Sequence, residues 1–361
     1  MELDPAFFQE NERLTSASDE RKIAAIGAMS VKAGGKLDEV QIAYETWGTL
    51  NADRSNAVLV CHALSGDSHA IGWWDRLIGP GKPIDTEQFF VIGTNALGGC
   101  QGSTGPSSLA ADGKPYGSRF PAIRVEDMVT AQARLMDQLG IEKLLMVCGG
   151  SMGGMQALEW AVQFPHRVKK AWLTASCRAH SAMQIGFNEA ARQAIMRDPK
   201  WLGGDYPLDD GPNGGLAVAR MIGHLSFLSE ESFARKFGRG LQNSESLRYV
   251  LTPEFQVESY LNYQGDKFTH RFDANSLLCL TKAIDWYECR SLESAKADFL
   301  ITSFNSDWLY PSHQSSELHQ MAQDAGLKSK WVDFDIPFGH DCFLLDGEHQ
   351  GTELRNFLSK D

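Results

Sequence analysis

The stretch KLLMVCGGSMGGMQALEW, residues 143–160, decides the fold, because it changes within one turn from an apolar run to a helical pattern. The turn reads GGSMG, a Gly-x-Ser-x-Gly pattern centred on Ser151. Glycines two positions before and after a serine allow a turn tight enough to lift its hydroxyl clear of a sheet. The serine then lies at a helix N-terminus, where backbone N–H groups stabilise negative charge. The pattern predicts that Ser151 is a nucleophile.

Two other interpretations of these glycines stay open at this point, namely a phosphate-binding turn and a tight packing joint between strand and helix. The turn lacks the Lys-Ser/Thr ending of a P-loop and the longer spacing of a dinucleotide-binding fingerprint. A serine hydroxyl reacts at neutral pH only with a histidine base that a carboxylate orients. Partner residues elsewhere in the chain must therefore decide between the interpretations.

Short apolar runs separated by turns and helical patterns recur along the chain. Their continuous apolar character is typical of strands that are covered on both faces. A helical pattern at 125–140 ends at Gly140, a common helix stop. The alternation predicts an α/β protein with a doubly wound, mostly parallel sheet. The runs lie at 56–64, 89–95, 144–150, 170–176, 298–304 and 330–335.

One long segment interrupts this alternation. Residues 178–290 contain no convincing parallel strand, but they do contain three helix-like pieces, at 181–196, 215–227 and 274–288. The sequence therefore predicts a core built from residues 1–177 and 291–361, with residues 178–290 inserted as a helical lid.

Composition excludes several classes of protein. The 361-residue chain has a net charge of −12, which opposes binding to nucleic acid or to an anionic membrane. Its seven cysteines are scattered, so we expect neither a disulfide framework nor a metal site. The opening MELDPAFFQENERL lacks the order of a signal peptide, and no stretch is long enough to span a bilayer. We expect a cytoplasmic protein that acts on small molecules.

Two residues are placed to complete a catalytic triad with Ser151. In this strand and helix order the acid and then the histidine follow the nucleophile, each after a strand. Asp307 follows the run at 298–304, and His340 lies in a glycine-led loop after the run at 330–335. Taken singly, the aspartate reads equally as a turn residue and the histidine as a structural group. Their order and positions together predict the triad Ser151, Asp307 and His340.

An acyl-transfer site also needs two N–H groups that stabilise an oxyanion. One is expected from Met152, the residue after the nucleophile. The other is expected from the turn in CHALSGDSHA, which follows the run at 56–64, and Leu64 is our candidate. A simple turn that ends the strand explains the same residues.

Sequence blocks spread from residue 42 to residue 345 resemble the homoserine O-acyltransferases of the α/β-hydrolase superfamily. They are far longer than a generic serine-hydrolase motif, and they cover nearly the whole chain. The blocks are YETWGTLN, CHALSGDSHA, WWDRLIGPGKPIDT, LGGCQGSTGPSS, PYGSRFP, GGSMGGMQALEWA, GLAVARMIGHLSFLS, KFGR, SYLNYQGDKFTHRFDANS, SDWLYP and GHDCFLL.

The resemblance implies transfer of an acyl group from acyl-coenzyme A to the hydroxyl of L-homoserine, a step of methionine biosynthesis, with no permanently bound cofactor. It implies that Arg220 and Asp341 bind the substrate, and a guanidinium and a carboxylate suit the two charges of an amino acid. Without the resemblance, Arg220 reads as a surface residue and Asp341 as a helix cap. The resemblance also suggests a homodimer formed through the helical lid.

The acyl donor is the least constrained expectation. Family members that use a succinyl donor resemble one another in an arginine two residues after the triad aspartate, and this chain has Leu309 there. An apolar side chain suits an acetyl methyl group and leaves a carboxylate unpaired, which is costly in a closed pocket. We expect acetyl-coenzyme A as the cosubstrate. The alternatives are a homoserine or serine O-succinyltransferase, an esterase or thioesterase, and a non-catalytic binding protein, which the intact triad order disfavours.

Overall fold

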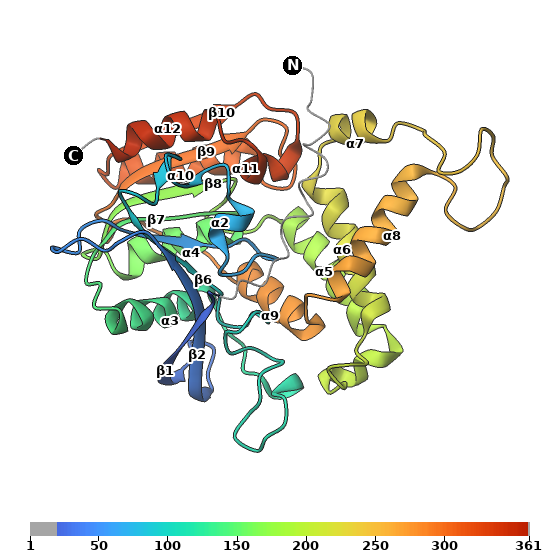
Figure 1. Ribbon diagram of the computed structural model, residues 1–361, viewed down its shortest axis with the longest axis horizontal. Coiled ribbons are helices and arrows are strands. Elements are labelled where there is room, and N and C mark those ends of the chain that lie inside the picture. Colours follow the sequence, from blue (N-terminus) through green and yellow to red (C-terminus); the bar gives the residue numbers. More distant parts are fainter. Residues whose placement is uncertain (1–19, 360–361) are drawn as a thin grey trace.

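A mixed sheet of eight strands forms the centre of the molecule (Figure 1). The computed structural model describes residues 20–359, so the N-terminal residues that bear on a signal peptide lie outside it. The strand order is β1-β2-β6-β3-β7-β8-β9-β10, and every pair from β6 to β10 is parallel. The predicted doubly wound, mostly parallel sheet is confirmed. The strands are β1 (Lys22–Ser30), β2 (Lys36–Trp47), β3 (Ala57–Cys61), β6 (Phe90–Thr94), β7 (Leu144–Gly150), β8 (Val168–Thr174), β9 (Asp298–Phe304) and β10 (Ser329–Phe334).

The six apolar runs of the sequence form the six parallel strands. The other two strands of this sheet, β1 and β2, were not predicted from the sequence. They pair antiparallel at one edge of the sheet, and β2 also pairs antiparallel with β6. In β1 only Ile26 and Met29 are buried. An edge hairpin with a solvated face has no continuous apolar run, so the pattern that marks the interior strands does not mark this hairpin.

Helices cover both faces of the sheet, and each face has its own apolar cluster. On one face α3, α4 and α10 bury residues such as Leu135, Leu158 and Leu318. On the other face lie α2, α11 and α12, and Trp74 stacks on Trp172 with ring centroids 5.0 Å apart. The bounds are α2 (Ala70–Trp73), α3 (Val125–Gln138), α4 (Met152–Gln163), α10 (Ser312–Asp324), α11 (Cys342–Leu345) and α12 (His349–Leu358), with short pieces β4 (Ile78–Gly79), β5 (Ile84–Asp85), η2 (Gly117–Arg119) and η4 (Gly339–Asp341).

Between β8 and β9 the chain leaves the sheet and forms helices at one side of the molecule (Figure 1). The two ends of this lid meet at an antiparallel bridge between Ala179 and Glu288, which we call the neck. The sequence analysis did not predict α7 and α8. In α8 only Gln264, Gly265 and Phe268 are buried, too few for a clear apolar stripe. The lid contains α5 (Ala182–Met196), η3 (Pro199–Gly204), α6 (Asn213–Phe227), α7 (Glu230–Lys236), α8 (Gln256–Thr269) and α9 (Ala274–Asp285).

Membrane-spanning helices were sought throughout residues 20–359. None of the helices there is both long enough and apolar enough to cross a bilayer.

One ionisable group lies inside the core on α4, well away from the turn that begins the helix. Glu159 is 8% exposed. Burial, together with the negative charge of Glu126, raises the pKa of Glu159 from 4.5 to about 7. The folded protein therefore holds a proton on Glu159 at pH values where the unfolded chain has released it.

We predict that Glu159→Gln removes a pH-dependent loss of stability. Below pH 4.5 the side chain is protonated in both states, and as the pH rises from 4.5 through 7 the wild-type protein loses up to about 3 kcal/mol relative to the variant. The measurement is urea unfolding of both proteins at pH 5 and pH 8. If the difference in free energy of unfolding between the two proteins were the same at pH 5 and pH 8, the prediction would be contradicted.

Candidate active site

The turn between β7 and α4 holds Ser151 in a strained conformation. Ser151 precedes α4 with φ 55° and ψ −124°, a region that non-glycine residues rarely adopt. A Cβ atom on Gly153 would lie 2.1 Å from the carbonyl oxygen of Cys61, and one on Gly149 would lie 2.4 Å from the Gly153 carbonyl carbon. The two glycines therefore let α4 start directly against β3, with Ser151 raised at the carboxyl end of the sheet.

The structure brings Asp307 and His340 together beside this turn. Asp307 follows β9, His340 lies in η4 after β10, and Asp307 Oδ2 lies 2.7 Å from His340 Nδ1. Both side chains are nearly inaccessible to solvent. The other oxygen, Oδ1, accepts hydrogen bonds from the backbone N–H groups of Leu309 and Tyr310 at 3.0 and 2.8 Å. The carboxylate is thus fixed, and it orients the imidazole.

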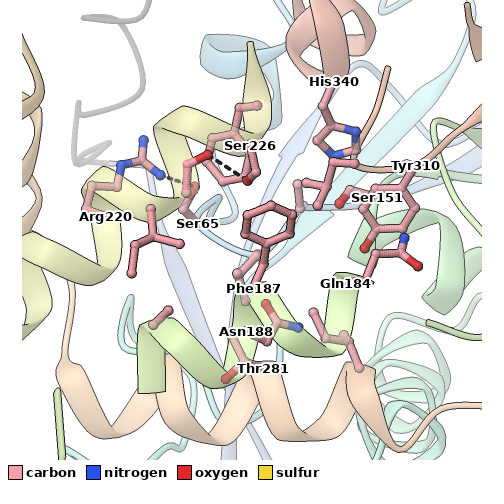
Figure 2. Close-up of a pocket in the computed structure, with 18 of the residues that line it drawn as sticks. Ser65, Ser151, Gln184, Phe187, Asn188, Arg220, Ser226, Thr281, Tyr310 and His340 are labelled. Atoms are coloured by element: carbon pink, nitrogen blue, oxygen red, sulfur yellow. Dashed lines mark hydrogen bonds between the residues drawn. The ribbon is translucent and has the colours of Figure 1, made fainter. Parts of the chain in front are cut away.

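Ser151 and His340 line one cavity between the core and the lid. The cavity, including its open mouth, holds about 920 Å³ of space free of protein atoms. Figure 2 shows Ser151, Tyr310 and His340 on one side of the cavity, and Arg220 on the opposite side. Among the described residues, Ser151 and His340 make no direct hydrogen bond to each other. Such catalytic contacts are often long without substrate.

Arg220 of α6 and Asp341 of η4 bring opposite charges to this cavity. Arg220 Nη1 donates to Ser65 Oγ at 3.3 Å, and its guanidinium lies over the ring of Phe268, 4.7 Å from the centroid. Burial and the nearby Arg271 cation lower the pKa of Arg220 to about 10, a shift that Asp341 opposes. Arg220 therefore remains charged at neutral pH, and the cavity offers both a cation and an anion to a ligand.

The two backbone groups expected to hold an oxyanion lie near Ser151. Met152 is the first residue of α4, and Leu64 lies in the turn after β3 and lines the cavity. Within residues 20–359, neither N–H donates a hydrogen bond to another protein group. Free donors at this place suit an oxygen that becomes negative.

Leu309 lines the same cavity and is 9% exposed. Its backbone N–H holds Asp307, so the side chain stands next to the triad. Leu309 gives the cavity an apolar wall at that point. Over residues 20–359, no three histidine, cysteine or acidic side chains are placed to hold a metal ion.

Several polar residues of the cavity wall were not predicted from the sequence, among them His180, Gln184 and Tyr310. His180 lies in the helical insertion and does not follow a strand, so the triad pattern does not select it. A signal for Tyr310 was present, because it stands in the block SDWLYP with Asp307 and Leu309. Nothing in the sequence pattern links the lid residues to Ser151, since only the tertiary fold brings them together.

Comparison with known proteins agrees with this geometry. A family model described as the alpha/beta hydrolase fold matches residues 56–345, which confirms the expected fold. The chain is similar to a homoserine O-acetyltransferase of Solidesulfovibrio magneticus, with 51% identity over 92% of this chain and 89% of that protein. It is also 46% identical to a homoserine O-succinyltransferase of Bordetella petrii, over 92% of this chain and 84% of the relative.

Solved structures give two further likenesses. The homoserine O-acetyltransferase of Bacillus anthracis superimposes with a TM-score of 0.88 at 29% identity, covering 94% of this chain and 98% of that one. The esterase E22 superimposes with a TM-score of 0.87 at 30% identity, covering 94% of this chain and 100% of the other. Proteins of this fold therefore include one described as an acyltransferase and one described as an esterase.

We predict that Ser151→Ala abolishes reaction with a small activated ester while leaving the fold intact. With p-nitrophenyl acetate, wild type should carry an acetyl group on the peptide that contains Ser151, and the variant should react at least about a thousand-fold more slowly. Ser226→Ala, which removes another hydroxyl from the cavity wall, is the matched control and should react like wild type. A variant that keeps a tenth of the wild-type rate would show that Ser151 is not the nucleophile.

Proposed function

We propose, since this chain belongs to the homoserine O-acyltransferase family of the α/β hydrolases, that it transfers an acetyl group from acetyl-coenzyme A to the hydroxyl of L-homoserine. The chain is a homoserine acyltransferase by its likeness to curated enzymes over nine-tenths of its length. The observation that carries the chemistry is the pairing of His340 with Asp307 beside the strained turn at Ser151. The acetyl donor and the ping-pong course are our proposals.

In the first half-reaction, Ser151 Oγ attacks the thioester carbonyl while His340 Nε2 takes its proton. The carbonyl oxygen becomes negative and lies against the N–H groups of Leu64 and Met152. The C–S bond then breaks, and the thiolate of coenzyme A leaves with the proton from His340. An acetyl ester on Ser151 remains.

In the second half-reaction, homoserine occupies the cavity with its carboxylate on Arg220 and its ammonium on Asp341. Its hydroxyl gives a proton to His340 and attacks the ester, and the departing Ser151 oxygen takes that proton back. The apolar lining contributed by the lid limits the access of water, which would otherwise hydrolyse the ester. Because coenzyme A leaves before homoserine reacts, the kinetics are expected to be ping-pong.

Overall identity does not decide the donor, because the acetyl-using and succinyl-using relatives stand at 51% and 46%. Leu309 favours acetyl, since the wall beside the triad is apolar at that point. A succinyl carboxylate there would lose its hydration without gaining a cationic partner. Serine is the nearest alternative acceptor, because one methylene changes binding by only about 1–3 kcal/mol.

We further propose a cytoplasmic homodimer that works in methionine biosynthesis and binds neither nucleic acid nor membrane. The net charge of −12 supports the proposal that the protein binds neither nucleic acid nor an anionic membrane. Support for the dimer comes from apolar side chains on the outside of the lid, since a group of this kind marks an interface. These side chains are Met183 and Ile185 on α5, Val218 and Leu225 on α6, and Tyr263 on α8, each at least 39% exposed.

An assay of coenzyme A release from acetyl-coenzyme A, with and without L-homoserine, tests the function. An acyltransferase should release coenzyme A steadily only when homoserine is present, with O-acetylhomoserine as product. Equal release of coenzyme A without homoserine would favour the second candidate function, an esterase or thioesterase. The structural likeness to esterase E22 supports this second candidate.

Arg220→Lys should impair the second half-reaction and spare the first. A lysine ammonium keeps the charge but cannot hold a carboxylate in the two-point geometry of a guanidinium. We expect the rate of deacetylation by homoserine to fall about ten-fold or more, with acetylation by acetyl-coenzyme A within about two-fold of wild type. Arg197→Lys, on the exposed end of α5, is the matched control. Equal losses in both half-reactions would assign Arg220 a structural role.

Leu309→Arg should shift the donor preference toward succinyl-coenzyme A, because it supplies the missing cation beside the triad. The measurement is the ratio of kcat/KM for acetyl-coenzyme A and succinyl-coenzyme A, in wild type, in Leu309→Arg and in the apolar control Leu309→Met. The ratio should favour acetyl in wild type and in Leu309→Met. A wild-type enzyme that prefers succinyl-coenzyme A would refute the proposed donor, whether or not Leu309→Arg folds.

A further inference from the structure

A second buried aspartate and histidine pair lies next to the triad, and it comes from the lid. His180 stands just before α5, and Asp285 is the last residue of α9. His180 Nδ1 lies 2.8 Å from Asp285 Oδ1, and both side chains are at least nine-tenths buried. Asp285 also accepts hydrogen bonds from Asn188 Nδ2 and Arg192 Nη1, each at 2.7 Å. The pair is therefore fixed from several sides.

The partners of Asp285 set the direction of the hydrogen bonds that continue from it. Burial favours the protonated acid, but the hydrogen bonds from His180, Asn188 and Arg192 hold the pKa of Asp285 below its usual value. An ionised carboxylate only accepts, so His180 Nδ1 carries the ring hydrogen, and in that tautomer Nε2 is an acceptor. The Tyr310 hydroxyl, 2.7 Å from Nε2, is then the donor.

Tyr310 contacts Asp307 and His340 and lines the cavity beside Ser151. Its backbone N–H donates to Asp307 Oδ1, and its ring stacks on that of His340 with centroids 4.7 Å apart and planes 16° apart. Its side chain lines the same cavity as Ser151. Because the Tyr310 hydrogen is directed to His180, the Tyr310 oxygen can act as an acceptor toward the cavity. Burial keeps the pKa of Tyr310 well above its usual value, so the phenol stays protonated and cannot replace His340 as the base.

We propose that Asp285, His180 and Tyr310 form a positioning chain that holds Ser151 in the rotamer from which it attacks. The proposal rests on the proposed function in one respect, that Ser151 is the nucleophile. The Tyr310 oxygen holds the serine side chain beside His340, and attack then needs only a turn of the hydroxyl hydrogen toward Nε2. Without this acceptor, Ser151 populates its other rotamers, and fewer molecules are ready to react.

The test follows the reaction of Ser151 with p-nitrophenyl acetate, which depends on neither coenzyme A nor homoserine. The serine oxygen forms a bond to the acetyl carbon, p-nitrophenolate leaves, and His340 receives the proton. Tyr310→Phe keeps the stacked ring and removes the acceptor, so the rate constant for acetylation should fall about ten-fold. Tyr206→Phe is the matched control, because it removes a buried tyrosine hydroxyl that is bound to Asp273 Oδ1 at 2.6 Å, away from the triad. It should react like wild type.

Two substitutions of His180 separate positioning from simple stability. His180→Gln places an amide oxygen where Nε2 lies and keeps a partner for Tyr310, so at least about a third of the wild-type rate should remain. His180→Asn reaches Asp285 but not Tyr310, and its rate should fall to that of Tyr310→Phe. The double variant Tyr310→Phe, His180→Asn should be no slower than Tyr310→Phe alone, because members of one chain are not additive.

Three results would overturn the positioning chain: a wild-type rate in Tyr310→Phe, equal losses in His180→Gln and His180→Asn, or losses that multiply in the double variant. Failure of the proposed function looks different. If wild type and Ser151→Ala react alike, Ser151 is not the nucleophile, and both proposals fall. If wild type acetylates Ser151 with the ester but not with acetyl-coenzyme A, the donor is wrong and the positioning chain is still tested.

Discussion

The close approach of α4 to the carbonyl group of Cys61 is the constraint on which the site depends. Because Gly153 has no side chain, the helix can begin directly against β3, and Ser151 at its start has φ 55°. The same strand β3 leads into the turn that carries Leu64, so one contact brings Ser151, the proposed nucleophile, to the same end of the sheet as the N–H groups of Leu64 and Met152. Gly150 acts in the same way toward the histidine loop, because a Cβ atom there would lie 2.4 Å from the ring of Phe343, three residues after His340.

The sequence was sufficient for the interior strands of this fold and for the proximity of Asp307 and His340, because both follow local rules. Continuous apolar runs marked the parallel strands, and the strand ends then located Asp307 and His340. The hairpin of β1 and β2 was not predicted, because its exposed face interrupts the apolar pattern. His180 and Asp285 were not predicted for another reason. They are 105 residues apart in the chain, and only the folded lid brings them to 2.8 Å.

The charges of the cavity explain why the triad alone does not define the reaction. An esterase of the same fold matches this chain at 30% identity, so the acceptor must be chosen by groups outside the triad. Arg220 is buried enough for its pKa to fall to about 10, and Asp341 is the opposite charge that acts on it. In the bound complex that we propose, the carboxylate and ammonium of an amino acid would contact Arg220 and Asp341 directly. A water molecule carries no such charges and would gain no comparable contacts. We therefore attribute the proposed selection of the acceptor to Arg220 of the lid and Asp341 of η4.

The lid contacts the wall of the active-site cavity close to the point where it leaves the core, through His180 and Tyr310. The neck bridge joins Ala179 to Glu288, and the Cys289 N–H donates to the Arg178 carbonyl oxygen at 2.8 Å. His180 directly follows one side of this bridge, and Asp285 precedes the other by three residues. The pair bonded to the Tyr310 hydroxyl therefore lies beside the neck. The neck thus adjoins the part of the cavity wall that holds Tyr310 and His340, and α6 beyond it brings Arg220 to the space that we propose for the acceptor.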